Sequence, residues 1–272
     1  MASAVAARHF GRKTLAMAAL AACLSAPMAA CGTLPGTSGD SGADTSSTDA
    51  KPSQIDPQLK MAALQAEAQH NYLEAAQHYQ SLLSRDPNNL ELAIALARNL
   101  RFAGSTPQDV DILNQLILKH GRTPQLLAEL GKSYVASDRM NLAVPVLQEC
   151  ASMPGATWDA FSALGVAYDY QGDFANARQA YAQALMLSPR NPEILNNLAL
   201  SQAQSGDLTG AIETLGQAVD QPSASAQVRQ NLALMMALRG DTSGAERLAR
   251  KDLPKEMAEQ NASYYQYLTS GN

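Results

Sequence analysis

The residues of this sequence that could carry out chemistry are few, and their spacing does not describe an active site. His70, His78 and His120 lie beyond the first fifty residues, and they form neither a His-Glu-x-x-His pattern nor a spaced set with cysteine. Zinc sites need histidine or cysteine at such spacings, so the sequence predicts no metal site. Glycine-rich phosphate-binding loops are also absent from the sequence. We therefore expect no catalytic residues, no cofactor and no enzymatic activity.

The three cysteines differ in what surrounds them. Cys150 occupies a position at which neighbouring copies of a sequence repeat, described below, carry Ala184 and Ala218. We expect Cys150 to be a small buried residue, because nothing in the repeat places a histidine where it could activate the thiol. Cys23 and Cys31 each follow a short box of small residues, Leu-Ala-Ala and Met-Ala-Ala, which are candidate lipoprotein cleavage sites.

Residues 1–30 have the character of a secretory signal peptide. Arg8, Arg12 and Lys13 precede an apolar, alanine-rich run that extends from residue 15 to residue 30. This run is too short and too rich in small residues to be a stable membrane span. Cleavage before Cys31 leaves a longer apolar core than cleavage before Cys23, so we expect lipidation at Cys31. Lipidation at Cys23 and ordinary signal cleavage remain as alternatives.

A polar linker follows the expected anchor, from Cys31 to residue 55. It is rich in glycine, serine, threonine and aspartate, so we expect it to be disordered, with a typical reach of about 25–30 Å. The glycine after Cys31 resembles the sorting signal of Gram-negative lipoproteins of the outer membrane, which implies a lipid-anchored protein on the periplasmic face. The full chain has a net charge of −5, and loss of the basic signal makes the mature chain more acidic. An acidic chain disfavours nucleic-acid binding and membrane attachment through charge.

The strongest pattern in the sequence is a repeat of 34 residues that begins at residue 56 and continues without an insertion. The copies are 56–89, 90–123, 124–157, 158–191, 192–225 and 226–259. Their eighth positions carry only small residues, which let two helices approach closely: Ala63, Ala97, Gly131, Gly165, Ala199 and Ala233. Glycine recurs at one site between the two helices of a copy, where it suits a left-handed turn: Gly104, Gly172, Gly206 and Gly240.

This is the tetratricopeptide pattern, and it predicts an all-α solenoid. Six helical hairpins and a C-terminal capping helix over 255–270 make about thirteen helices in one right-handed superhelix. The copy 158–191 fits the pattern best. The copy 90–123 fits it least, because Asp109 replaces the usual alanine and Pro107 follows the turn, so we expect its second helix to start late.

In this architecture the first helix of each hairpin lines a concave groove that binds peptides. The positions that face such a groove are Arg98, Arg101, Phe102, Lys132, Val166, Tyr170, Asn196, Leu200, Gln230, Leu234 and Leu238. They predict a basic mouth and an apolar floor with amide edges. Two alternatives remain open: the leucines pack against adjacent helices, and the basic residues form a solvated face.

Several segments go beyond the general repeat pattern. They include Ala163–Tyr168, Asn196–Ser201, Val228–Leu234 and the ending Ala245–Pro254, which closes with Asp-Leu-Pro. In these segments the chain resembles the TadD family of Tad/Flp pilus assembly lipoproteins. The resemblance implies an outer-membrane scaffold that helps to assemble the tight-adherence pilus machine, with its secretin as partner. The alternative is a tetratricopeptide lipoprotein of another envelope machine, such as a type IV pilus pilotin or a component of β-barrel assembly.

Overall fold

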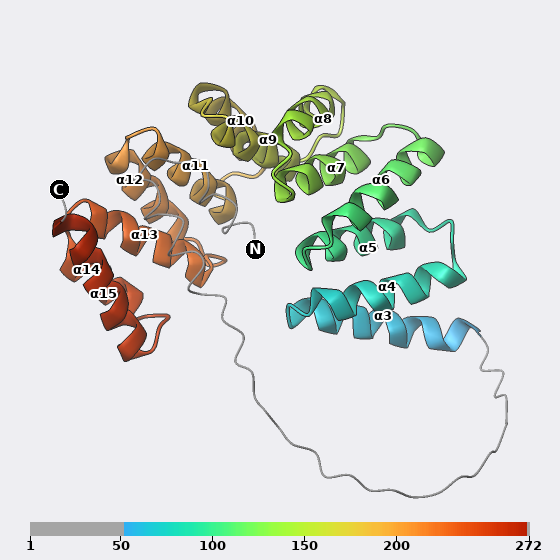
Figure 1. The fold of residues 1–272 in the computed structure, drawn as a ribbon, viewed down its shortest axis with the longest axis horizontal. Helices are drawn as coiled ribbons and strands as arrows, with labels where there is room; N and C mark the ends of the chain where they lie inside the picture. Colours follow the sequence, from blue (N-terminus) through green and yellow to red (C-terminus); the bar gives the residue numbers. More distant parts are fainter. Residues whose placement is uncertain (1–51, 271–272) are drawn as a thin grey trace, which may run out of the picture. The chain divides into compact units, whose positions relative to one another are not determined.

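The computed structural model describes residues 52–270, and this part of the chain contains thirteen α-helices and no strand (Figure 1). The expected signal peptide, Cys23, Cys31 and nearly all of the expected linker lie outside the described residues. The helices are α3 (Pro52–Ala68), α4 (Tyr72–Arg85), α5 (Leu90–Phe102), α6 (Thr106–His120), α7 (Pro124–Ala136), α8 (Met140–Ser152), α9 (Trp158–Tyr170), α10 (Phe174–Leu187), α11 (Pro192–Gln204), α12 (Leu208–Val219), α13 (Ala226–Leu238), α14 (Thr242–Ala249) and α15 (Lys255–Ser270).

The helix boundaries follow the 34-residue period. From α5 to α13, every first helix of a hairpin begins at the first position of its copy, and every second helix begins at the seventeenth. The helix α3 is the exception, since it begins at Pro52, before the expected start at residue 56. The expectation of a late start for α6 is wrong. Pro107 lies in the first turn of α6, where its missing N–H is not needed, so the helix begins at Thr106 in register with the others.

Each turn within a hairpin contains a left-handed residue, and in the last three hairpins the aspartate after it caps the next helix. Gly172, Gly206 and Gly240 have φ of 75°, 96° and 102°, and the aspartate that follows each of them caps the next helix. Asp173, for example, accepts a hydrogen bond from the backbone N–H of Asn176 at 3.2 Å. Capping of this kind satisfies a helix donor that would otherwise lack a partner. In these three hairpins, neighbouring residues in the sequence therefore supply both the turn conformation and the cap.

Both helices of a hairpin contribute small buried residues to the core, and larger side chains pack against them. Alanines at the twentieth position of the copies are fully buried: Ala75, Ala143, Ala177, Ala211 and Ala245. Gly165 on α9 faces the ring of Tyr181 on α10, and a Cβ atom at this glycine would lie 2.6 Å from the ring atom Cε1. Tyr181 itself is fully buried. The small residues at the eighth position thus permit the close packing of the two helices that the sequence predicts.

The chain divides into two compact units, and the division falls between Ala103 and Gly104. Among the described residues, the first unit contains α3 to α5 and the second contains α6 to α15. The division separates the two helices of the copy 90–123, which departs most from the repeat pattern. We describe each unit by itself.

Candidate functional site

In the first unit, the predicted binding residues lie on the last two turns of α5. The side chain of Phe102 is 43% exposed, although aromatic side chains of this size usually avoid water. The guanidinium carbon of Arg101 lies 4.6 Å from the centroid of the Phe102 ring, in a cation–π contact. The ring of Tyr72 also lies near Phe102, with 4.9 Å between the two ring centroids. Tyr72 was not predicted as part of this surface, and it enters because α4 begins beside the end of α5.

In the second unit, Lys132 does not offer a free positive charge. Its ammonium lies 2.7 Å from Glu129 Oε1 and 2.6 Å from Asp159 Oδ2, and only 17% of its side chain is exposed. Burial alone would raise the pKa of Asp159, but the nearby Lys132 overcomes this effect and lowers it. Lys132 therefore links α7 to the first turn of α9. This contact leaves it unsuited to the basic mouth that the sequence predicts.

The apolar residues predicted for the second unit divide into two groups. Val166, Tyr170, Leu200 and Leu238 are half-buried and keep part of their surface accessible. Leu234 is only 4% exposed, so for this residue the structure follows the alternative of packing against adjacent helices. The remaining half-buried side chains lie on α9, α11 and α13, which are the first helices of three successive hairpins.

Amide side chains connect these three helices. Asn197 donates to Ser162 Oγ at 3.2 Å, and Asn231 donates to Asn196 Oδ1 at 2.7 Å. Asn196 and Asn197 are joined to each other at 3.4 Å, and Gln227 donates to Asn231 at 3.0 Å. Of this row, sequence reasoning predicted only Asn196. Asn197 and Asn231 both stand at the sixth position of their copies, so an alignment of these positions would have identified them. Ser162 stands at the fifth position and Gln227 at the second.

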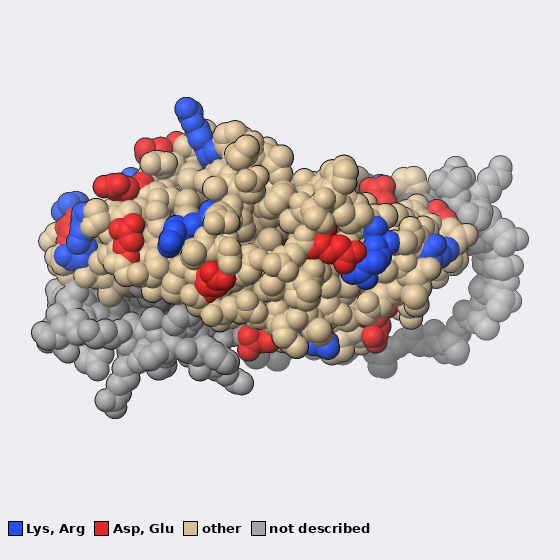
Figure 2. All heavy atoms as spheres, turned by 90° about the horizontal axis from the view of Figure 1, so that it is seen from above, with Lys and Arg blue, Asp and Glu red and all other residues tan. Residues whose placement is uncertain are grey.

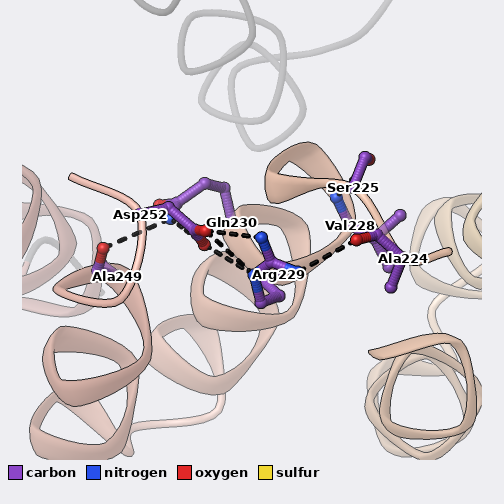
Figure 3. Close-up of polar contacts among 7 residues, drawn as sticks. All are labelled: Ala224, Ser225, Val228, Arg229, Gln230, Ala249 and Asp252. Carbon is purple, nitrogen blue, oxygen red and sulfur yellow. Dashed lines mark hydrogen bonds and ion pairs between the residues drawn. The ribbon is translucent and has the colours of Figure 1, made fainter. Parts of the chain in front are cut away.

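Gln230 belongs to a different structure, a polar cluster at the C-terminal end of the second unit (Figure 3). Its side chain is 3% exposed and donates to Ala249 O and Asp252 Oδ2, both at 3.4 Å. Arg229 donates through Nε and Nη2 to the carboxylate of Asp252, at distances of 2.5–3.0 Å, and through Nη1 to Ala224 O at 3.0 Å. Hydrogen bonds from Arg229 lower the pKa of Asp252 despite partial burial. Arg229, Gln230 and Asp252 therefore connect α13 to the segment between α14 and α15.

Cys150 has the surroundings of a structural residue. It is fully buried with Leu127, Ala128 and Ala160, and its Sγ donates a hydrogen bond to Pro124 O at 3.2 Å. Burial raises the pKa of its thiol to about 11, so the thiolate is scarce near neutral pH. Within residues 52–270, no cluster of histidine, cysteine, aspartate or glutamate is suited to a metal ion. None of the described helices is both long enough and apolar enough to cross a membrane.

Comparison with known proteins supports the fold. Residues 162–226 match the model of a tetratricopeptide repeat family. The chain is similar in structure to TTC0263, a tetratricopeptide repeat protein of Thermus thermophilus, with a TM-score of 0.61 and 21% identity over 66% of this chain and 98% of that one. No curated protein matches the sequence.

Two further solved structures share this fold. PilF of Pseudomonas aeruginosa gives a TM-score of 0.59 with 14% identity, covering 81% of this chain and 99% of that one. PilW, described as a widely conserved type IV pilus biogenesis factor, gives a TM-score of 0.59 with 15% identity, covering 73% and 92%. At these identities the likeness shows the fold alone. The family match and the shared fold together identify the described part of the chain as an α-solenoid of tetratricopeptide repeats.

Proposed function

We propose that this protein is an outer-membrane lipoprotein that serves as a protein-binding scaffold in the assembly of a Tad/Flp pilus machine, with the secretin of that machine as its partner. The observation that carries the proposal is the row of tetratricopeptide hairpins, an architecture whose accessible first helices bind protein segments. The choice of a Tad/Flp machine rests on the resemblance of Asn196–Ser201, Val228–Leu234 and Ala245–Pro254 to the TadD family.

The chemistry of the second unit favours an uncharged stretch of partner chain. Val166, Leu200 and Leu238 leave aliphatic surface accessible on α9, α11 and α13. The amide row on the same helices has hydrogen-bonding groups of both kinds, and such groups can pair with a peptide backbone. A partner segment could thus bury its apolar side chains against this aliphatic surface. Its backbone N–H and C=O groups could form hydrogen bonds with the amide side chains.

The distribution of charge agrees with a protein partner. On the face drawn in Figure 2, lysine and arginine lie interspersed with aspartate and glutamate on a surface made mostly of other residues. Several of the basic side chains are held in ion pairs, as Arg122 is with Glu149 at 2.5 Å. Nucleic-acid binders instead gather lysine and arginine on one face. We therefore include no nucleic acid among the partners.

The proposal is tested by purification of the protein from crosslinked outer membranes, with identification of the proteins that remain attached. We expect the pilus secretin and its neighbours to be recovered, and secretin multimers to be lost when this protein is deleted. Recovery of another envelope machine, with pili unaffected by the deletion, would contradict the proposal and favour a type IV pilus pilotin or a β-barrel assembly component.

A pair of variants locates the binding surface. Leu200→Lys places a charge among the half-buried residues of α11, and we expect it to abolish the crosslinked complex while the circular dichroism spectrum is unchanged. The matched control is Met186→Lys on α10, where the methionine is 74% exposed. We expect this control to bind normally. Normal binding by Leu200→Lys, or equal loss of binding in both variants, would contradict the assignment of the binding surface to α9, α11 and α13.

A further inference from the structure

A buried carboxylate connects three helices of the second unit. Asp169, on the last turn of α9, is only 7% exposed. Its Oδ2 accepts a hydrogen bond from Tyr181 Oη of α10 at 2.7 Å, and its Oδ1 accepts one from Ser201 Oγ of α11 at 2.6 Å. Tyr181 and Ser201 are fully buried. Asp169 therefore joins the two helices of one hairpin to the first helix of the next hairpin.

The first unit repeats this arrangement at the same positions of the repeat. Glu67 of α3 hydrogen-bonds Tyr79 of α4, and Asn99 of α5 donates to Glu67 Oε1 at 2.6 Å. In both cases the acid stands at the twelfth position of a copy, the tyrosine at the twenty-fourth, and the polar partner at the tenth position of the following copy. Because the same hydrogen-bonded group occurs in both units, we regard it as a recurring feature of the repeat and not as a chance contact. Aligning these three positions would have found it in the sequence.

The two hydroxyl groups suit the ionised form of Asp169 better than the neutral form. A carboxylate accepts hydrogen bonds on both oxygens, whereas a carboxylic acid must use one oxygen to donate. Burial acts in the opposite direction, because it disfavours the charge. Burial prevails over the two hydrogen bonds and raises the pKa of Asp169 to about 6.

We propose that the junction of the α9–α10 hairpin with α11 is a proton-operated joint, in which protonation of Asp169 changes how Ser201 is held. When Asp169 takes up a proton from solvent, its new O–H group must donate to one of the hydroxyls that previously donated to it. Ser201 is the one able to turn, since a helical serine can donate instead to the carbonyl four residues earlier in its own helix. The bond between α9 and α11 then runs in the reverse direction and loses its charge assistance, which makes it weaker.

Asp169 is the group that titrates in this joint, because most other ionisable groups of the neighbouring helices make their contacts elsewhere. From α10 it meets Tyr181 and the more distant Arg178, which favours the ionised form. From α11 it meets the neutral Ser201. Ionisable groups of α7 and α8 make their contacts elsewhere: Glu129 and Lys132 meet at the other end of α9, Tyr134 lies under Arg139, and Glu149 pairs with Arg122. The joint does not depend on the proposed pilus function.

The test follows Asp169 and α11 separately in the intact protein by NMR. The carboxyl carbon of Asp169 is expected to titrate with a midpoint of about 6, and the amide signals of α11 near Ser201 should shift with the same midpoint. In Ser201→Ala, Asp169 still titrates, at a higher pH because one hydrogen bond to the ionised form is lost, and α11 no longer responds. A Glu67→Gln control, which changes the equivalent acid of the first unit, should leave both signals unaltered.

Unfolding by denaturant gives an independent measure. The raised pKa means that folded protein binds this proton more tightly than unfolded protein, so acidification from about pH 7 to about pH 5 favours the folded state at this residue. We expect the denaturation midpoint to rise more on this acidification in wild type than in Asp169→Asn. The proposal is overturned if Asp169 titrates at the value of a solvated aspartate, or if α11 follows the titration equally well in Ser201→Ala.

Discussion

Gly165 determines how closely α9 and α10 can approach. A Cβ atom at this position would lie 2.6 Å from Tyr181 Cε1, well inside van der Waals contact. The ring cannot easily move aside, because it is fully buried and its hydroxyl is bound to Asp169. We therefore expect Gly165→Ala to lower the free energy of unfolding by about 1–3 kcal/mol, as overpacked cores do, measured by urea denaturation.

The control for this substitution is Gly216→Ala. Gly216 lies inside α12, and a Cβ atom there would meet nothing within 4 Å. Alanine is the better helix former, so this variant should be as stable as wild type or more stable by up to about 1 kcal/mol. If both variants lost stability equally, the cause would be the replacement of a helical glycine by alanine as such and not the contact with Tyr181.

The sequence predicts the role of a single side chain well where that role recurs in every copy. It predicts the role poorly where one particular partner residue decides it. Small residues at the eighth position are buried as expected, since every hairpin needs the same close approach. Lys132 was expected in a basic mouth, but its pairing with Asp159 depends on a side chain from the next copy. Gln230 turns away from the predicted surface because Asp252, in a segment that follows the last hairpin, provides it with a partner.

At the scale of elements, the turn inside each hairpin requires a left-handed residue, and two copies supply it without glycine. Asp138 has φ of 59° between α7 and α8, where Gly172 has 75° in the next copy. A side chain in this region is strained, although aspartate tolerates it better than most residues. We expect Asp138→Gly to raise the free energy of unfolding by about 0.5–1 kcal/mol, which thermal or chemical denaturation would measure.

Asp138→Ala is the matched comparison for the turn. Alanine lacks the polar side chain that helps aspartate adopt a left-handed conformation, so this variant should be less stable than wild type. The order Gly, then Asp, then Ala is the expected ranking of stability. An Ala variant as stable as the Gly variant would show that the turn conformation costs nothing here.

Helix boundaries were the most predictable feature, because the same left-handed turn recurs every 34 residues. Each copy thus provides an independent prediction of the same boundary. The expected delay of α6 failed because Pro107 was judged by its distance from the turn, whereas its position within the first helical turn decides whether it is tolerated. Asp109 was likewise regarded as a weakness of this copy. In the structure it is fully buried and accepts a hydrogen bond from Ser133 Oγ at 2.7 Å.

At the scale of the whole molecule, the hairpins of each unit present two different kinds of surface. The first unit exposes Phe102 beside Arg101 and Tyr72, and the second exposes aliphatic and amide groups on α9, α11 and α13. Aromatic and arginine side chains are frequent among residues that dominate binding energy. A scaffold with two chemically distinct surfaces can bind two different protein segments. A protein that brings the parts of an assembly together must bind more than one of them.

The proposed site of action depends on a lipid anchor at Cys31. A lipid on this residue would attach the described hairpins to a membrane through the linker, for which the sequence predicts a reach of about 25–30 Å. We expect Cys31→Ala to abolish incorporation of radiolabelled palmitate and to release the protein from the outer-membrane fraction. Cys23→Ala, which changes the other candidate box, should retain both the label and the membrane association. The opposite pattern would assign the anchor to Cys23. A wild-type protein that takes up no label would remove the lipid anchor, and with it the attachment to the outer membrane, from the proposed function.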